Sequence, residues 1–308
     1  MKIKSIQAPS AVVMVRPHHF HPNPETADDN AFQRTAASSA QVTAEIAREE
    51  VTAAAAALEA AGVTVHVFDD FGAQETPDSV FPNNWFSTHS GGHIAIYPMY
   101  SPNRRRERRI DVIDMLKAQY RVQDVIDYSG LEYDGLFLEG TGAMVLDHLD
   151  RVAYTACSNR ANAVALERFC THFNFEPMAF PSADATGCPI YHTNVMMCIG
   201  TDFAMIGLDM ITDPVRRSEI QTRMQETGRE VIALDSRQIA EFAGNAIELS
   251  TDSGRILAMS ARAKASLTPD QISIIERSAR ILPLSVPTIE MAGGSVRCML
   301  AGIHLTRR

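Results

Sequence analysis

The chain has 308 residues, of which 45% are hydrophobic and 21% are charged, fractions that exclude a disordered or collagen-like chain. Its 37 acidic residues outnumber its 28 Lys and Arg residues, so the net charge is −9, which disfavours nucleic acid as a partner. No apolar run reaches the roughly 18 residues that span a bilayer, and the N-terminus lacks the apolar core of a signal peptide. We therefore expect a cytoplasmic protein that binds a small molecule, with no membrane or nucleic-acid partner.

The cysteines form no pattern that indicates disulfides or zinc, because they are odd in number, widely spaced and without a C-x-x-C pair. They are Cys157, Cys170, Cys188, Cys198 and Cys298. We predict four buried thiols and one reactive thiol. A metal site at His18, His19 and His21 is disfavoured as well, because these residues lie in a proline-bounded loop without an H-E-x-x-H motif.

Taken in chain order, the predicted elements repeat one unit of a strand, a turn, a second strand, a helix and a third strand. The first unit has strands at 11–17 and 63–68 around a helix at 35–61 and lacks one strand. The hairpins of the next four units are 82–89 and 93–99, 136–146 and 152–157, 191–199 and 203–211, and 246–250 and 255–260. Their helices and closing strands are 105–120 and 122–128, 162–173 and 175–180, 214–228 and 230–234, and 269–280 and 282–286. Thr268 is the predicted cap of the last helix. A strand at 295–305 completes the first unit if the chain closes into a ring.

One polar residue stands near the start of the hairpin in each unit, at a nearly constant spacing. Glu139, His192, Asn245 and Cys298 follow one another at intervals of 53 residues, and Asn84 lies 55 residues before Glu139. A fixed period of this kind indicates a repeat architecture in which no unit buries its sheet alone. Equivalent positions of a closed ring lie near its axis, so we expect these five side chains to converge. Similar spacings also occur in other α/β folds, which is the alternative.

The converging side chains supply the parts of nucleophilic catalysis by cysteine. A thiol reacts as the thiolate and needs a neighbouring base or cation. His192 is the predicted base for Cys298, and Glu139 is predicted to orient the imidazole. Gly293 and Gly294 allow a ligand to approach the backbone closely before the cysteine. Each of these residues alone is more typical of a protein core, so the prediction depends on their shared spacing.

Five stretches of the chain carry motifs of a known superfamily. They are 77–84, 138–140, 158–162, 192–194 and 293–298. Together these stretches resemble the pentein, or guanidine-modifying, superfamily of arginine deiminases, dimethylargininases and amidinotransferases, and the resemblance covers residues 11–305. The stretch 16–33, together with F-P-N-N-W-F-S-T-H at 81–89, resembles the branch of citrulline utilization hydrolases. The resemblance implies a five-module α/β-propeller with pseudo-fivefold symmetry and a central active site, in a single catalytic domain at 1–308.

The resemblance also implies an activity and its site. The activity is that of a hydrolase acting on carbon–nitrogen bonds other than peptide bonds, through a covalent thiol intermediate and without a metal or organic cofactor. Arg160 is the implied partner of the substrate α-carboxylate, and Arg105 is a weaker candidate because its basic run is typical of a solvated helix start. Asp78 lies in the implied substrate loop, and we expect Asn245 to contact the substrate from its place in the register.

Two departures from the family favour a neutral substrate. Deiminases of this superfamily hold the cationic guanidinium between two aspartates, whereas this chain has Asn84 and Asn194 at those places. An opposite unit charge at about 4 Å is worth about 4 kcal/mol at an effective dielectric of 20, so two carboxamides forgo much of the attraction for a cation. A carboxamide offers a donor and an acceptor, which match a ureido group. We predict hydrolysis of citrulline to ornithine, ammonia and carbon dioxide.

Alternatives stay open. Asp78 supplies one negative charge, so an arginine dihydrolase, an arginine deiminase or a dimethylarginine dimethylaminohydrolase is the first alternative. A non-catalytic protein that binds arginine or citrulline is the second. Asn84 in Pro-Asn-Asn is also compatible with a purely structural turn. The order in which the nitrogens leave, a homo-oligomeric state, and closure of residues 17–33 over the site are not predicted by any pattern.

Overall fold

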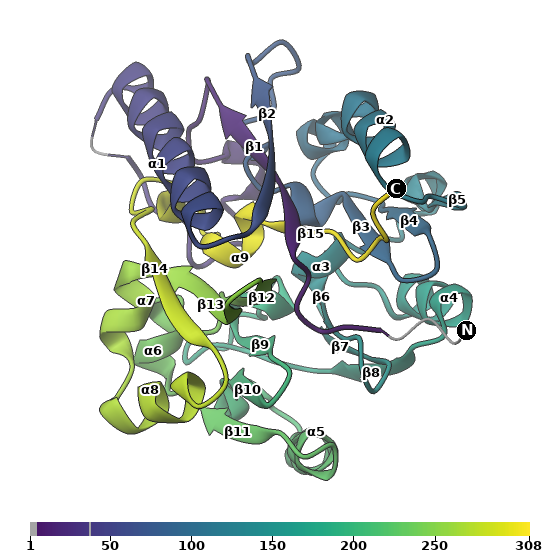
Figure 1. The fold of residues 1–308 in the computed structure, drawn as a ribbon, viewed down its shortest axis with the longest axis vertical. Helices are drawn as coiled ribbons and strands as arrows, with labels where there is room; N and C mark the ends of the chain where they lie inside the picture. The colour runs from purple at the N-terminus through teal and green to yellow at the C-terminus, as the bar shows by residue number, and fades with distance from the viewer. Residues whose placement is uncertain (1–4, 37) are drawn as a thin grey trace.

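Five three-stranded sheets surround a central axis, and the longer helices lie at the periphery of the ring (Figure 1). The computed structural model describes residues 5–36 and 38–308. In every sheet the middle strand pairs antiparallel with one neighbour and parallel with the other. A hairpin followed by a helical crossover produces this order in four sheets, and in the first sheet the last strand of the chain takes the place of the first hairpin strand. The five-module α/β-propeller expected from the repeat is therefore confirmed.

The sheets follow the chain order, except that the last strand of the chain belongs to the first sheet. That sheet contains β15 (Ala301–Gly302), β1 (Ala11–Pro17) and β2 (Thr64–Asp70). The second and third sheets contain β3 (Phe86–His89), β4 (His93–Ile96) and β5 (Asp124–Asp127), and β6 (Met144–Asp147), β7 (Val152–Ala156) and β8 (Glu176–Phe180). The fourth and fifth contain β9 (Met197–Ile199), β10 (Phe203–Ile206) and β11 (Glu230–Ala233), and β12 (Ile247–Thr251), β13 (Gly254–Ser260) and β14 (Arg280–Leu284).

The crossover helices are α1 (Ala40–Ala60), α2 (Ile110–Gln119), α4 (Ala163–Phe173), α5 (Pro214–Glu226), and α7 (Ala261–Ser266) with α8 (Pro269–Glu276). Except for α2, each crossover helix begins after a Ser, Asn, Asp or Thr residue whose side chain accepts from a backbone N–H of the first turn. The predicted cap Thr268 is confirmed, because its side chain accepts from the Gln271 N–H in a capping box. Three helices are short: α3 (Gly140–Ala143), α6 (Ser236–Ala240) and α9 (Val296–Met299).

Pairing of the two ends of the chain closes the ring. Val12 of β1 lies opposite Gly302 of β15, and Val13 lies opposite Ala301. The predicted strand at 295–305 is thus correct only at its end, because its first half forms the helical turn α9. The predicted strand at 136–146 is interrupted by the helical turn α3 and becomes a strand only at Met144, because Gly140 has a φ of +48° that a strand does not accommodate.

Other boundaries differ from the sequence-based expectation by a few residues. The helix expected at 35–61 begins at Ala40, after the Ser39 cap, and residue 37 lies outside the described residues. The helix expected at 105–120 is divided into a 3-10 turn at Pro102–Glu107 and α2, because Arg108 and Arg109 are extended.

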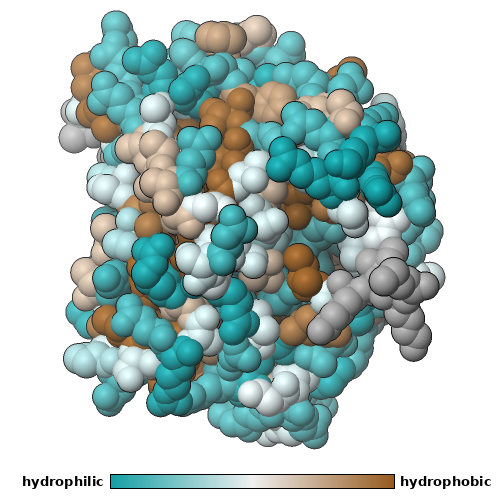
Figure 2. Space-filling view, viewed as in Figure 1, coloured by the Kyte–Doolittle hydropathy of each residue, from teal (hydrophilic) through white to brown (hydrophobic). Residues whose placement is uncertain are grey.

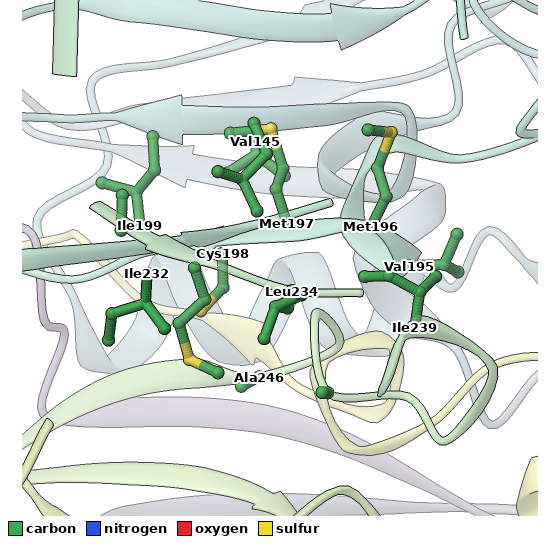
Figure 3. Close-up of a cluster of buried hydrophobic side chains, with 14 of the residues drawn as sticks. Val145, Val195, Met196, Met197, Cys198, Ile199, Ile232, Leu234, Ile239 and Ala246 are labelled. Carbon is green, nitrogen blue, oxygen red and sulfur yellow. The ribbon is translucent and has the colours of Figure 1, made fainter. Parts of the chain in front are cut away.

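Hydrophobic packing joins the modules to one another. One buried cluster combines Val145 of β6, Met197 of β9 and Leu257 of β13, which belong to three different sheets, and Figure 3 shows its centre around β9. The face of the molecule seen in Figures 1 and 2 is mostly hydrophilic. Hydrophobic residues gather on it between α1 and α2 (Figure 2). No helix among the described residues is long and apolar enough to cross a membrane.

The cysteine expectation is corrected. Cys170, Cys198 and Cys298 are buried, but Cys157 is exposed and Cys188 is partly exposed, so four buried structural thiols are not present. All five are free thiols. Cys157 directly follows the last residue of β7, where the strand leaves the sheet, and this position carries its side chain to the surface.

Candidate active site

The five polar residues of the repeat register meet at one end of the ring. Asn84 ends a 3-10 turn, Glu139 and His192 precede helical turns, and Cys298 lies within α9. Contacts across modules confirm the convergence: His192 Nε2 lies 2.8 Å from Glu139 Oε2, and Asn245 Nδ2 lies 3.2 Å from Cys298 Sγ. All five side chains are buried.

Glycines permit the close approach of the module turns. A Cβ added to Gly142 would lie 2.2 Å from the side-chain amide of Asn84 and 2.9 Å from His192 Nδ1. A Cβ added to Gly140 would lie 2.4 Å from the carbonyl oxygen of Asn83. No side chain fits at such distances, so the spacing of these polar side chains depends on glycine in the turn that follows Glu139.

Two carboxamides face the sulfur of Cys298. Asn194 Nδ2 lies 3.3 Å and Asn245 Nδ2 lies 3.2 Å from Sγ. The amide of Asn245 is oriented by its other contacts, because its Oδ1 accepts from the Arg297 N–H and its Nδ2 also donates to the carbonyl of Asn194. Its donor therefore points at Sγ. Two N–H donors stabilise a thiolate without adding a charge.

The imidazole of His192 is held by Glu139 through Nε2, while its buried Nδ1 has no hydrogen-bond partner. Burial lowers the pKa of His192, and the hydrogen bond to Glu139 offsets only part of this effect. The ring is therefore neutral near neutral pH and able to accept a proton. A free Nδ1 opposite an oriented Nε2 is the arrangement that a general base requires.

Glu139 is the common acceptor of three basic side chains. Besides His192, Arg104 Nη1 lies 3.5 Å and Arg160 Nη1 lies 3.7 Å from its Oε2, and the Tyr100 N–H donates to its Oε1 at 2.9 Å. Burial alone would raise the pKa of Glu139, but the two guanidinium groups and the His192 hydrogen bond together lower it below its ordinary value. Glu139 is therefore a carboxylate whenever the site is intact.

Asp78 and Asn84 both lie against Arg104. Asp78 Oδ2 is 3.6 Å from Arg104 Nε and accepts from Asn23 Nδ2 at 2.8 Å, while its Oδ1 is buried without a hydrogen-bond partner. Burial raises the pKa of Asp78, and Arg104 opposes this shift. In the amide orientation that satisfies both of its ends, Asn84 accepts from Arg104 Nη1 and Nη2 at 3.0 and 2.9 Å. Asn84 is thus a binding partner of this guanidinium.

The arginine that enters the site is Arg104, and the prediction for Arg105 is corrected accordingly. Arg105 donates outward to the carbonyls of Met99 and Tyr100, at 3.0 and 3.2 Å, and 33% of its side chain is exposed. Arg104 instead forms a buried bidentate pair with Glu107, at 2.8 and 3.0 Å. Burial raises the pKa of Glu107 to about 7, although Arg104 opposes the shift.

Arg160 lies where the resemblance placed a carboxylate-binding group, yet a protein side chain already occupies it. Both Asp29 oxygens accept from its guanidinium, one of them from Nε at 3.0 Å, and the Tyr191 ring lies 5.0 Å from Cζ. Asp29 belongs to the cover segment, residues 17–33. This segment also contributes Asn23, whose Nδ2 donates to Asp78, and Asn30, whose Nδ2 donates to the carbonyl of Ala292 at 3.0 Å. Residues 17–33 therefore lie over the site.

Sequence reasoning missed Arg104, Glu107 and the cover-segment residues Asn23 and Asp29. The spacing of Arg104 and Glu107, three residues apart in one helical turn, was the available signal for their pair. Asp29 had none, because it pairs with a residue 131 positions away. No group of three or more side chains suited to a metal ion occurs within residues 5–36 and 38–308.

Comparison with known proteins places the chain among enzymes of arginine chemistry. A family model described as N,N dimethylarginine dimethylhydrolase, eukaryotic, matches residues 16–305. No curated protein matches the sequence.

Solved structures share the fold at low identity. The substrate-bound N-terminal domain of ArgZ, a cyanobacterial arginine dihydrolase, aligns over 95% of this chain and 97% of its own, with 16% identity and a TM-score of 0.73. AgrE with ornithine and NAD+ aligns over 96% of this chain but only 39% of AgrE, with 17% identity and a TM-score of 0.74. The dimethylargininase of Pseudomonas aeruginosa, in complex with citrulline, aligns over 98% of this chain and 100% of its own, with 14% identity and a TM-score of 0.66.

Proposed function

Because the chain belongs to the N,N-dimethylarginine dimethylhydrolase family of the pentein superfamily, we propose that it is a cysteine hydrolase that converts citrulline to ornithine, ammonia and carbon dioxide. The coarser part of this statement, a hydrolase of carbon–nitrogen bonds in guanidino-type compounds, follows from the family. Citrulline as the substrate is our inference from the residues that contact the nucleophile.

The neutral surroundings of Cys298 support citrulline. The side chains within hydrogen-bond distance of Sγ are the carboxamides of Asn194 and Asn245. A ureido group is uncharged and offers both N–H donors and a carbonyl acceptor, which two carboxamides complement. A guanidinium offers donors only and gains most from a carboxylate, which neither position supplies.

The proposed reaction begins with neutral His192. It accepts the thiol proton of Cys298, and Sγ attacks the ureido carbon to form a carbon–sulfur bond. One carbon–nitrogen bond then breaks, and the departing nitrogen takes the proton from His192, which leaves a thiocarbamate on Cys298. Water attacks this carbon while His192 accepts its proton, and the thiolate departs. Decay of the released carbamate gives carbon dioxide and the second amine, so one water is consumed for each citrulline.

Glu139 supports both steps by holding the imidazole through Nε2, at 2.8 Å, so that the imidazolium formed in each proton transfer faces a carboxylate. The two arginines beside Glu139 keep it ionised. Arg160 is the proposed partner of the substrate α-carboxylate, because a planar guanidinium binds a carboxylate bidentately, as it does with Asp29.

Arginine is the second candidate, and the charges of the site favour it. Asp78, Glu107 and Glu139 are buried carboxyl groups around two guanidinium groups, and Asp78 Oδ1 has no hydrogen-bond partner. An excess of buried carboxyl groups favours a cationic ligand. ArgZ, whose domain shares the fold, is an arginine dihydrolase.

The deciding experiment incubates the protein separately with citrulline, arginine and dimethylarginine and identifies the products. Ornithine, ammonia and carbon dioxide from citrulline support the proposal. Ornithine from arginine, without turnover of added citrulline, supports the second candidate. Citrulline that accumulates from arginine identifies a deiminase and contradicts the proposal. A Cys298→Ser variant is the control, since it leaves the fold but removes the nucleophile.

A further inference from the structure

The ion pair between Arg160 and Asp29 differs from the other ion pairs of the site in the segment that supplies the carboxylate. Arg104 is held by the bidentate contact with Glu107 and by Asn84, and Glu139 is held by His192 and the Tyr100 N–H. Each of these partners comes from a module of the ring. The bidentate partner of Arg160 is instead Asp29, which lies on the cover segment between β1 and α1, and the carboxylate of Glu139 is farther away, 3.7 Å from Nη1.

The two members of this pair also differ in burial. Arg160 is 1% exposed in its side chain, whereas Asp29 is 19% exposed. A buried guanidinium is costly without a counter-charge, but a partly exposed carboxylate tolerates a change of partner. Asp29 is therefore the member of the pair that is able to move, and without it the Arg160 guanidinium keeps only the more distant carboxylate of Glu139 and has no bidentate partner.

A free α-amino acid carries the charges that fit an exchange with this pair. Its carboxylate and its ammonium are attached to the same carbon, so the two charges lie as close together as the two members of a bidentate ion pair. If the carboxylate replaced Asp29 on Arg160 and no cation followed, Asp29 would lose its partner. If the ammonium pairs with Asp29, every charge keeps a counter-charge, and the cover segment closes again over the substrate.

We propose that Asp29 is a specificity-determining residue that binds the substrate α-ammonium, so that Arg160 and Asp29 together select free α-amino acids with both charged groups. This inference rests on the proposed function, and it applies equally to citrulline and to arginine. The cover segment is suited to the task, because Asn23 anchors it to Asp78 at 2.8 Å and Asn30 anchors it to the carbonyl of Ala292 at 3.0 Å, on either side of Asp29.

The test compares citrulline with its desamino analogue 5-ureidopentanoate, in the wild-type protein and in Asp29→Asn. In the wild type, kcat/KM for citrulline should exceed that for the analogue at least about tenfold, since a hydrogen bond to a charged group is worth at least that factor. In Asp29→Asn, KM for citrulline should rise about tenfold or more while the values for the analogue change little. Asp28→Asn, at an exposed neighbouring carboxylate, should keep wild-type constants.

Three outcomes would overturn the inference. Equal kcat/KM for citrulline and 5-ureidopentanoate in the wild type shows that the ammonium is not recognised. A lower KM for citrulline in Asp29→Asn shows that Asp29 only blocks Arg160. An equal loss for both compounds in Asp29→Asn shows a structural role.

The failure of the proposed function is distinguishable from these outcomes. If the protein hydrolyses none of citrulline, arginine and dimethylarginine, the proposed function fails, and binding replaces turnover as the readout. Calorimetry with ornithine and with its desamino counterpart 5-aminopentanoate then tests the same pair. Tighter binding of ornithine that is lost in Asp29→Asn but kept in Asp28→Asn supports the inference, and equal binding of the two compounds contradicts it.

Discussion

Replacement of Asn194 by Asp changes the charge beside Cys298, the proposed nucleophile, while nearly keeping the shape of the side chain. It converts an N–H donor 3.3 Å from Cys298 Sγ into a carboxylate oxygen. At this separation two unit negative charges repel by about 5 kcal/mol at an effective dielectric of 20. The thiolate is therefore disfavoured when the substrate is neutral, whereas a bound guanidinium gains a counter-charge. Proton uptake by the new carboxylate and the nearby guanidinium groups reduce the full effect.

The assay is kcat/KM for citrulline and for arginine, measured in parallel on the wild type and Asn194→Asp. We expect the ratio of arginine to citrulline to rise at least about 100-fold, which corresponds to roughly 3 kcal/mol of the repulsion. Asn194→Ser is the matched control, because it removes the donor without adding a charge and should lower both values together. A folded Asn194→Asp protein with an unchanged ratio would refute the reasoning that charge at this position selects the substrate.

Three further predictions concern the base, the packing and the acid stability of the protein. Glu139→Gln should lower kcat at least about 100-fold, because His192 loses the carboxylate that stabilises its imidazolium, and steady-state kinetics measure the loss. Gly142→Ala should lower kcat at least about tenfold with an unchanged circular dichroism spectrum, because its Cβ would displace the groups of Asn84 and His192 that lie 2.2 and 2.9 Å away. Burial lowers the pKa of His304 to about 4, so this residue is neutral in the folded state but binds a proton in the unfolded chain below its ordinary pKa. The free energy of unfolding should therefore fall by up to about 3 kcal/mol as the pH falls from about 6.5 to 4, as measured by urea denaturation, and His304→Gln should reduce this dependence.

Each of these predictions has an outcome that contradicts it. Wild-type kcat in Glu139→Gln would show that His192 does not need this carboxylate. Wild-type kcat in Gly142→Ala would show that the turn after Glu139 has room for a side chain. The acid prediction fails if the free energy of unfolding has the same pH dependence in the wild type and in His304→Gln.

The sequence predicted the ring and the convergence of its polar register residues because both depend on a repeated pattern. The interval of 53 residues between Glu139, His192, Asn245 and Cys298 reflects one module of fixed size. A polar residue that recurs at the same place in each module must approach the axis of a closed ring, whatever the exact boundaries of its strand. The predicted convergence of these residues is therefore correct, although strands were predicted where α3 and α9 form helical turns.

The sequence did not predict contacts that depend on the direction in which a turn points each side chain, or on pairing between residues far apart in the chain. Arg104 and Arg105 are adjacent residues of the same type in one basic run, so the sequence does not distinguish them. The 3-10 turn directs the side chain of Arg104 inward to Glu107 and that of Arg105 outward to backbone carbonyls. The pair of Asp29 and Arg160 joins the long connection between β1 and α1 to the loop that precedes α4, and no periodicity indicates it.

The most direct test of the central claim is to trap the intermediate on Cys298. The protein is mixed with citrulline labelled in the ureido carbon, quenched with acid during turnover and digested for mass spectrometry. We predict a labelled thiocarbamate on the peptide that contains Cys298 and none in Cys298→Ser, and the mass of the adduct shows whether ornithine or ammonia leaves first. Turnover of citrulline with the label on no cysteine, or persistence of turnover in Cys298→Ser, would contradict the account.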